Sequence, residues 1–176
     1  GKGNEYRAEL KLEYGLTDRY NLMLYTVAKQ GHWKDDNNSS TRRAFTEILP
    51  GVKYLLFTDP FISTLQLKVK FPLNYNENDV PALGNHQIDI EGKLLTAQPW
   101  PKLPGYTKFE FGFKGRLGKP ANELPYYLEF GYNLIPKMIA KVSLDGKYSL
   151  RQHDQSVEDL VKYTVGPIFK FKDYLD

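Results

Sequence analysis

The sequence of 176 residues contains no cysteine and no long apolar run. Without cysteine, neither a disulfide framework nor a thiolate metal site can form. The run at 54–57 is typical of the longest apolar stretches, far short of the roughly 20 residues of a membrane helix, so a helical membrane protein is excluded. Helical periodicity is also poor, and only 156–162 could form a helical turn.

The chain also lacks a strong charge bias and any recognisable catalytic motif. A net charge of +3 without a Lys/Arg cluster gives no reason to expect nucleic acid as a partner. There is no glycine-rich phosphate loop, no nucleotide motif and no Ser/His/Asp arrangement in a diagnostic context, so we expect no enzyme activity and no cofactor. His32, His86 and His153 each have an acid nearby in or beside expected loops, but a metal site would need distant loops to converge, and none is assigned.

Aromatic residues are abundant, with 13 tyrosines and 10 phenylalanines, and both types favour strands. The clearest pattern lies at 106–134, where Phe109, Phe111 and Phe113 alternate with charged residues and glycine, and a second alternation follows from residue 126. A period of two places one class of side chain on each face of a strand. The Gly-Lys-Pro-Ala-Asn run between the two halves is turn chemistry, so this stretch predicts a β-hairpin.

The same period recurs along the whole chain and predicts an all-β protein of adjacent antiparallel strands with no linker or domain break. Pro50 lies within one of these segments and should sit near an edge or a bulge, because proline cannot donate to the ladder. We expect nine strands, at 6–14, 20–29, 45–57, 62–73, 86–96, 106–116, 126–134, 138–148 and 161–171.

Alternation alone does not say which face meets the outside. A soluble, lipocalin-like ligand-binding barrel buries its apolar face, whereas a transmembrane barrel turns that face toward lipid. Short connections such as 15–19 and 58–60 alternate with long polar ones such as 31–43 and 74–85, as in bacterial outer-membrane barrels. Strands of about 9–12 residues bounded by Tyr or Phe fit tilted membrane strands with interfacial aromatic girdles. We therefore expect a transmembrane up-and-down antiparallel β-barrel, with the soluble barrel as the alternative.

Several strings carry a family resemblance: EYGLTDRYNLML, GVKYLLFTDP, KFPLNYNENDVPALGNHQIDIEGKLL and LEFGYNLIPKMIAKVSLDGKYSL. In this order they resemble the outer-membrane β-barrel family of meta-pathway phenol-degradation proteins, often called transporter-like. The family's Glu-Tyr-Gly-Leu-Thr-Asp-Arg turn maps onto 13–19, its proline-bearing strand end and Leu-Gly-x-x-Gln-x-Asp loop onto 72–89, and its Leu-Asp-Gly onto 144–146. Asn85 and His86 stand where small residues are expected. The resemblance implies the bacterial outer membrane and a barrel, and its label suggests aromatic solutes.

The strand count points to a larger barrel. Single-chain bacterial barrels have an even number of strands, and nine are visible here. The N-terminal GKGNEY is not a signal peptide, so we expect a mature, trimmed or partial product. We expect one β-barrel domain over 1–176 that lacks a strand or more at each end, with 10–12 strands in the complete protein.

The two faces supply the candidate functional residues. The expected polar face carries fourteen cations and eight anions, so an open lumen would attract anions. In the alternative, these charges pair across the lumen and plug it, which leaves a structural scaffold for a periplasmic or surface partner. The expected partners are the lipid bilayer and a small solute, aromatic or anionic, which the sequence does not identify. The polar face comprises Arg7, Lys11, Lys53, Lys68, Lys70, Lys93, Lys108, Lys114, Arg116, Lys141, Lys147, Lys162, Lys170 and Lys172 with Glu9, Glu13, Glu47, Asp89, Glu91, Glu110, Glu129 and Asp145, and all but Glu47, Lys147, Lys170 and Lys172 are candidate pore-lining residues. The candidate lipid-facing residues are Leu10, Leu12, Leu65, Leu67, Val69, Phe109, Phe111, Phe113, Leu128, Phe130, Val142, Leu144, Val165 and Phe169.

Overall fold

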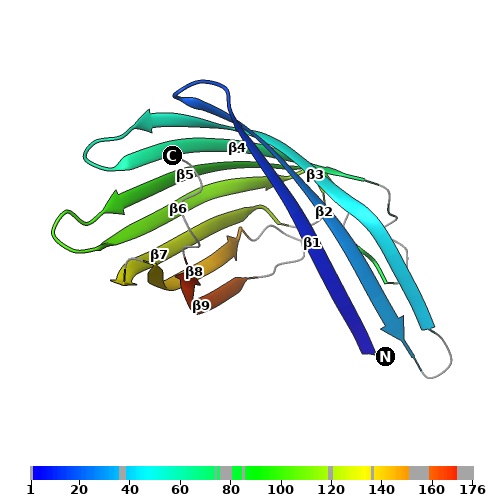
Figure 1. The fold of residues 1–176 in the computed structure, drawn as a ribbon. Helices are drawn as coiled ribbons and strands as arrows, with labels where there is room; N and C mark the ends of the chain where they lie inside the picture. The colour runs from blue at the N-terminus through cyan, green and yellow to red at the C-terminus, as the bar shows by residue number, and fades with distance from the viewer. Residues whose placement is uncertain are drawn as a thin grey trace. The chain divides into compact units, whose positions relative to one another are not determined.

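The structure is a computed structural model that describes residues 2–35, 39–73, 75, 81–84, 86–118, 121–135, 137–150 and 159–169. Nine antiparallel strands follow one another up and down in a single sheet whose order is that of the sequence. No helix in these ranges is long and apolar enough to cross a membrane. The strands are β1 (Lys2–Gly15), β2 (Tyr20–Lys34), β3 (Ser39–Phe57), β4 (Ile62–Pro72), β5 (Asp89–Pro99), β6 (Gly105–Arg116), β7 (Glu123–Ile135), β8 (Met138–Ser149) and β9 (Leu160–Phe169) (Figure 1).

All nine expected strands are present, but the expected polar loop at 31–43 is wrong. β2 continues to Lys34 and β3 already begins at Ser39. The register explains the extension, because β1 from Lys2 to Glu5 pairs with β2 from Lys34 back to Gly31. Ladder hydrogen bonds join backbone groups, so they continue through polar side chains that show no hydrophobic alternation.

Other boundaries also differ from expectation. β7 begins at Glu123 rather than 126, and it runs through Pro125, a residue that argues against a central strand. β5 begins at Asp89 rather than 86. Of the stretch considered for a helical turn, 160–162 belong to β9, and 156–158 lie outside the described residues.

The chain divides into two compact units. Unit 1 comprises 1–53, 67–91 and 115–118, and unit 2 comprises 54–66, 92–114 and 119–176. In unit 1, β1 and β2 form a hairpin with continuous register from Lys2 opposite Lys34 to Gly15 opposite Asn21. In unit 2, β6 pairs with β7, β7 with β8, and β8 with β9, each antiparallel.

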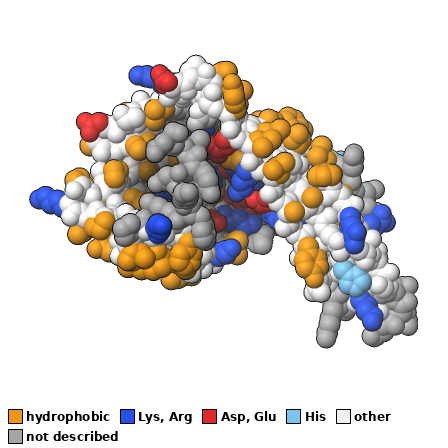
Figure 2. All heavy atoms as spheres, viewed as in Figure 1, with side chains coloured by type: hydrophobic (Ala, Val, Ile, Leu, Met, Phe, Trp, Pro, Cys, Tyr) orange, Lys and Arg blue, Asp and Glu red, His pale blue; other side chains and the backbone are white. Residues whose placement is uncertain are grey.

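The interior of the described structure is polar rather than apolar. Five apolar residues are buried, namely Met23, Val27, Tyr75, Leu83 and Ala121, against ten polar or charged ones. Large apolar side chains instead lie exposed along most strands, and the space-filling view shows many of them at the surface (Figure 2). This distribution is the reverse of the one that an ordinary soluble domain adopts.

Candidate functional site: a polar face of paired charges

The register of the first hairpin shows how the sequence sorts side chains onto two faces. Lys11 lies opposite Tyr25 and Glu13 opposite Met23, while Leu12 lies opposite Leu24. Because directly opposite residues share a face, the odd-numbered residues of β1 and β2 form one face and the even-numbered residues the other.

The polar face of unit 1 contains a cluster around Glu13. Lys53 Nζ lies 2.7 Å and 2.8 Å from the two carboxylate oxygens of Glu13, and the Tyr25 hydroxyl donates to the same carboxylate at 3.1 Å. The ammonium groups of Lys11 and Lys68 each lie 5.6 Å from the centre of the Tyr25 ring, within cation–π range. Charges from β1, β3 and β4 therefore meet around one tyrosine of β2.

A second cluster in unit 1 joins β4 to β5 and is more deeply buried. Lys70 Nζ lies 2.8 Å from Asp89 Oδ2, and the two side chains are only 9% and 1% exposed. Gln87 Nε2 donates to the other carboxylate oxygen of Asp89 at 3.0 Å. Lys68 pairs with Glu91 at 2.9 Å on the same two strands. A buried charge requires such partners, because an isolated one would cost several kcal/mol.

In unit 2, Glu123 and Glu110 each serve two lysines. Glu123 is buried and lies 3.6 Å from Lys114 Nζ and 3.1 Å from Lys147 Nζ. Glu110 lies 3.5 Å from Lys93 Nζ and 2.7 Å from Lys108 Nζ. Each of these two carboxylates therefore bridges two ammonium groups from two different strands.

Glu129 is the centre of a mixed polar cluster in unit 2. Lys141 Nζ lies 3.2 Å from its carboxylate, and the Tyr106 hydroxyl donates to it at 2.8 Å. Tyr127, on the same strand, donates to the second oxygen, and Lys108 lies over the Tyr127 ring at 5.2 Å. The carboxylate is therefore held by an ion pair and two phenol donors.

The ion pairs of the described residues include fifteen of the candidate pore-lining residues. Asp145 and Lys162 are both exposed and lie opposite one another in the β8–β9 register, and Arg116 is half-buried at the end of β6. The fifteen are Arg7, Glu9, Lys11, Glu13, Lys53, Lys68, Lys70, Asp89, Glu91, Lys93, Lys108, Glu110, Lys114, Glu129 and Lys141.

Sequence reasoning missed several members of these clusters. Glu123 lies before the strand that the sequence predicts at 126–134, although β7 begins with it. Tyr25 and Lys29 are absent from the predicted faces, because the hydrophobic alternation in this strand fades after Tyr25, although Lys29 pairs with Glu5 at 3.3 Å. The parity of the paired strand β1 was the signal that could have placed both.

The opposite, apolar face is the exposed one. Eleven of the fourteen candidate lipid-facing residues are between 44% and 77% exposed, and Val69, Leu128 and Leu144 are half-buried. The eleven are Leu10, Leu12, Leu65, Leu67, Phe109, Phe111, Phe113, Phe130, Val142, Val165 and Phe169.

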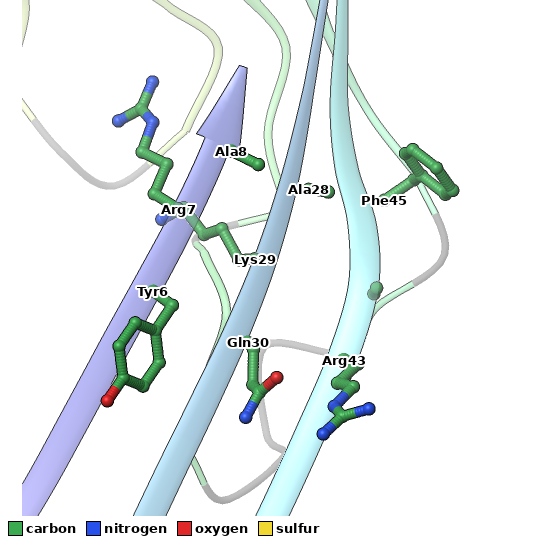
Figure 3. A pocket seen from close by; sticks show the side chains of 9 residues that line it. Tyr6, Arg7, Ala8, Ala28, Lys29, Gln30, Arg43 and Phe45 are labelled. Atoms are coloured by element: carbon green, nitrogen blue, oxygen red, sulfur yellow. The ribbon is translucent and has the colours of Figure 1, made fainter. Parts of the chain in front are cut away.

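A groove of about 480 Å³ crosses the first three strands in unit 1 (Figure 3). Ala8 and Ala28, which lie opposite one another in the register, line it with Tyr6 of β1 and Phe45 of β3. The small side chains leave room between the two rings. The full lining is Tyr6, Arg7, Ala8, Ala28, Lys29, Gln30, Arg43, Ala44 and Phe45.

The described histidines have polar or aromatic neighbours, and neither lies in a metal-type cluster. His32 Nδ1 lies 2.8 Å from Thr41 Oγ1, and the ring of His86 packs edge-on against Tyr75 at 5.3 Å. Within the described ranges no three His, Cys, Asp or Glu residues converge to hold a metal ion. His153 lies outside those ranges.

No family model matches the chain, and no curated protein matches it. The family resemblance of the sequence therefore stays a prediction. The functional argument depends on the two faces of the sheet.

Proposed function

We propose that this chain forms part of the wall of a bacterial outer-membrane β-barrel that conducts small solutes, with a preference for anions. The observation that carries the proposal is the inverted exposure: carboxylates such as Asp89, Glu123 and Glu129 are buried, while Phe109, Phe111 and Phe113 are exposed. In water each large exposed apolar side chain forgoes about 1.5–3 kcal/mol of burial free energy, which contact with acyl chains would recover. A lipid-facing surface of this kind is the distinguishing feature of membrane barrels.

The same observation argues against the soluble alternative. A lipocalin-like barrel encloses its apolar face and turns its charges to solvent. Here the described residues enclose the charges instead, since the Lys70 and Asp89 side chains are 9% and 1% exposed. The proposed apolar surface also gives the groove between Tyr6 and Phe45 a simple role, because its alanines leave space for an acyl chain.

The preference for anions follows from the composition of the expected polar face. The sequence assigns fourteen cations and eight anions to that face. The excess is positive, and a pore lined by it would raise the local concentration of anions. The solutes to be screened are small anions and aromatic compounds, the class that the family label suggests.

The ion pairs also support a second candidate, a plugged barrel that acts as a scaffold for an envelope protein. When lysines and carboxylates neutralise one another at 2.7–3.6 Å, few charges are left to bind a passing ion. In this case the barrel spans the membrane without conducting.

Two measurements test these proposals. Extraction of the full-length protein from bacterial membranes should require detergent, and release by salt or alkali alone would contradict both membrane proposals. Planar bilayers in a KCl gradient should then show channels with an anion-selective reversal potential. A cation-selective potential would overturn the anion channel, and the absence of conductance with detergent-dependent extraction would favour the scaffold.

A further inference from the structure

Pro81 and Leu83, in the connection between β4 and β5, lie against the polar face of β2. Gly31 shares that face with Val27 and Lys29, because alternate residues of a strand point the same way. A Cβ atom on Gly31 would lie 2.7 Å from Pro81 Cγ and 3.1 Å from Leu83 Cδ2. The described part of the connection therefore touches the wall at a position where only glycine leaves room.

The contacts of Tyr75 hold this segment together. Tyr75 and Leu83 are 9% and 4% exposed, and a Cβ atom on Gly84 would lie 2.6 Å from the Tyr75 hydroxyl. The backbone N–H of His86 donates to that hydroxyl at 2.9 Å, while its ring packs edge-on against the tyrosine ring. At the start of the connection, the Leu73 N–H donates to the Thr46 carbonyl of β3 at 2.9 Å.

Burial of apolar side chains accompanies this contact. Leu83 and Tyr75 are 4% and 9% exposed, and Met23 and Val27, which point to the same face from β2, are each 3% exposed. These are four of the five buried apolar residues in the described chain. Removing the Leu83 and Tyr75 side chains from water stabilises the position of the segment.

We propose that residues 81–84, anchored by Leu83 and Tyr75, form a constriction that sets the largest solute the pore admits. This inference rests on the proposed channel function and adds to it the element that determines size selectivity. A segment fixed on the lumen side of the wall occupies cross-section that the strands alone would leave open. The channel should therefore pass only solutes smaller than its strand number would allow.

The position of the segment can be tested without any conductance measurement. A Cβ atom on Gly31 would lie 3.3 Å from Pro81 Cβ, near the 3.5–4.5 Å of a disulfide. The native chain has no cysteine, so the double variant Gly31→Cys/Pro81→Cys should form one bridge on mild oxidation, detected by mass and by loss of thiol labelling. The control Gln30→Cys/Pro81→Cys, with its first cysteine on the opposite face of β2, should stay reduced. Absence of the bridge in the first pair would overturn the constriction and leave the proposed channel untouched.

The effect on the pore is tested by two variants in planar bilayers. Leu83→Ser weakens the apolar anchor and should raise single-channel conductance about two-fold or more. Ala82→Cys, at an exposed position, should conduct as the native protein does and lose about half its conductance when a bulky sulfonated thiol reagent is added. The matched control Leu103→Cys, in the exposed β5–β6 turn, should show no response to the reagent.

The outcomes separate the two proposals. If the bridge forms but neither Leu83→Ser nor labelled Ala82→Cys changes the conductance, the constriction is wrong and the channel stands. If the bridge forms and no variant conducts, the channel itself fails and the constriction fails with it. The labelled Ala82→Cys variant keeps the test decisive even when Leu83→Ser does not fold.

Discussion

Two charged groups on the polar face of unit 1 have the same chemistry but very different surroundings. On β1, Arg7 and Lys11 lie 2.6 Å and 3.4 Å from Glu9, with 51% and 61% of the cation side chains exposed. Between β4 and β5, Lys70 lies 2.8 Å from Asp89, with 9% and 1% exposed. The distances are similar, so desolvation rather than geometry decides how much each group contributes to the free energy of unfolding. Exposed pairs contribute little, and losing one partner of a buried pair is costly.

The largest effect is expected from Asp89→Asn. The substitution removes the charge that compensates Lys70 in a buried place, and we expect a loss of about 4 kcal/mol in the free energy of unfolding. Urea titration in detergent micelles, followed by the fluorescence of Trp33 and Trp100, measures this change. The double variant Lys70→Met/Asp89→Leu should lose much less, because it removes both charges of the buried pair. A loss as small as that of Glu9→Gln would contradict the role of burial.

Glu123→Gln should rank second. It removes the carboxylate that Lys114 and Lys147 share. Because both lysines are about one-fifth exposed, solvent compensates part of the lost attraction, and we expect a loss of about 2 kcal/mol by the same titration. The control Lys147→Gln should cost less stability, since Glu123 keeps its ion pair with Lys114. Equal losses in the free energy of unfolding would contradict the role of the shared carboxylate.

Gly131→Ala tests packing beside the Glu129 cluster instead of charge. Gly131 lies opposite Tyr106, and a Cβ atom there would overlap the Tyr106 ring, whose hydroxyl donates to Glu129. Displacing the ring should cost about 1–2 kcal/mol. Gly166→Ala is the matched control, because a Cβ atom there has nothing within 4 Å. Equal unfolding midpoints for the two variants would rule out the tight contact.

Glu9→Gln should have the smallest effect, at most about 1 kcal/mol. Its pairs with Arg7 and Lys11 are exposed, so the difference from the native protein should shrink further in about 1 M salt, where the screening length falls to about 3 Å. Comparison of urea midpoints at low and high salt measures this. A salt-independent loss comparable to that of Asp89→Asn would remove the contrast between the two groups.

Much of the strand pattern could be predicted from the sequence because side-chain parity is a local property. The alternation of Phe109, Phe111 and Phe113 with polar residues predicts both a strand and its two faces. The structure places the three phenylalanines together on an exposed face. The ion pair between Lys93 and Glu110 likewise follows from parity once β5 and β6 are neighbours.

The failures have a different physical origin. Polar strand ends such as Gly31–Lys34 are held by backbone pairing with β1, which leaves no trace in hydrophobic alternation. Glu123 precedes Pro125, a residue that argues against a central strand, so the sequence predicts no strand at Glu123. The contact of Pro81 and Leu83 with Gly31 depends on the path of the connection in space. Side-chain alternation does not predict the path of a polar connection.

Hydrogen bonds between residues 16–20 close the turn that joins β1 to β2. Leu16 and Thr17 donate their N–H groups to the Tyr20 carbonyl, and the Thr17 hydroxyl oxygen accepts from the N–H groups of Arg19 and Tyr20. Closing so short a loop carries a small entropic cost. Because these contacts are local in sequence, we expect the hairpin to form early in folding and to offer a paired edge to which the next strand can add.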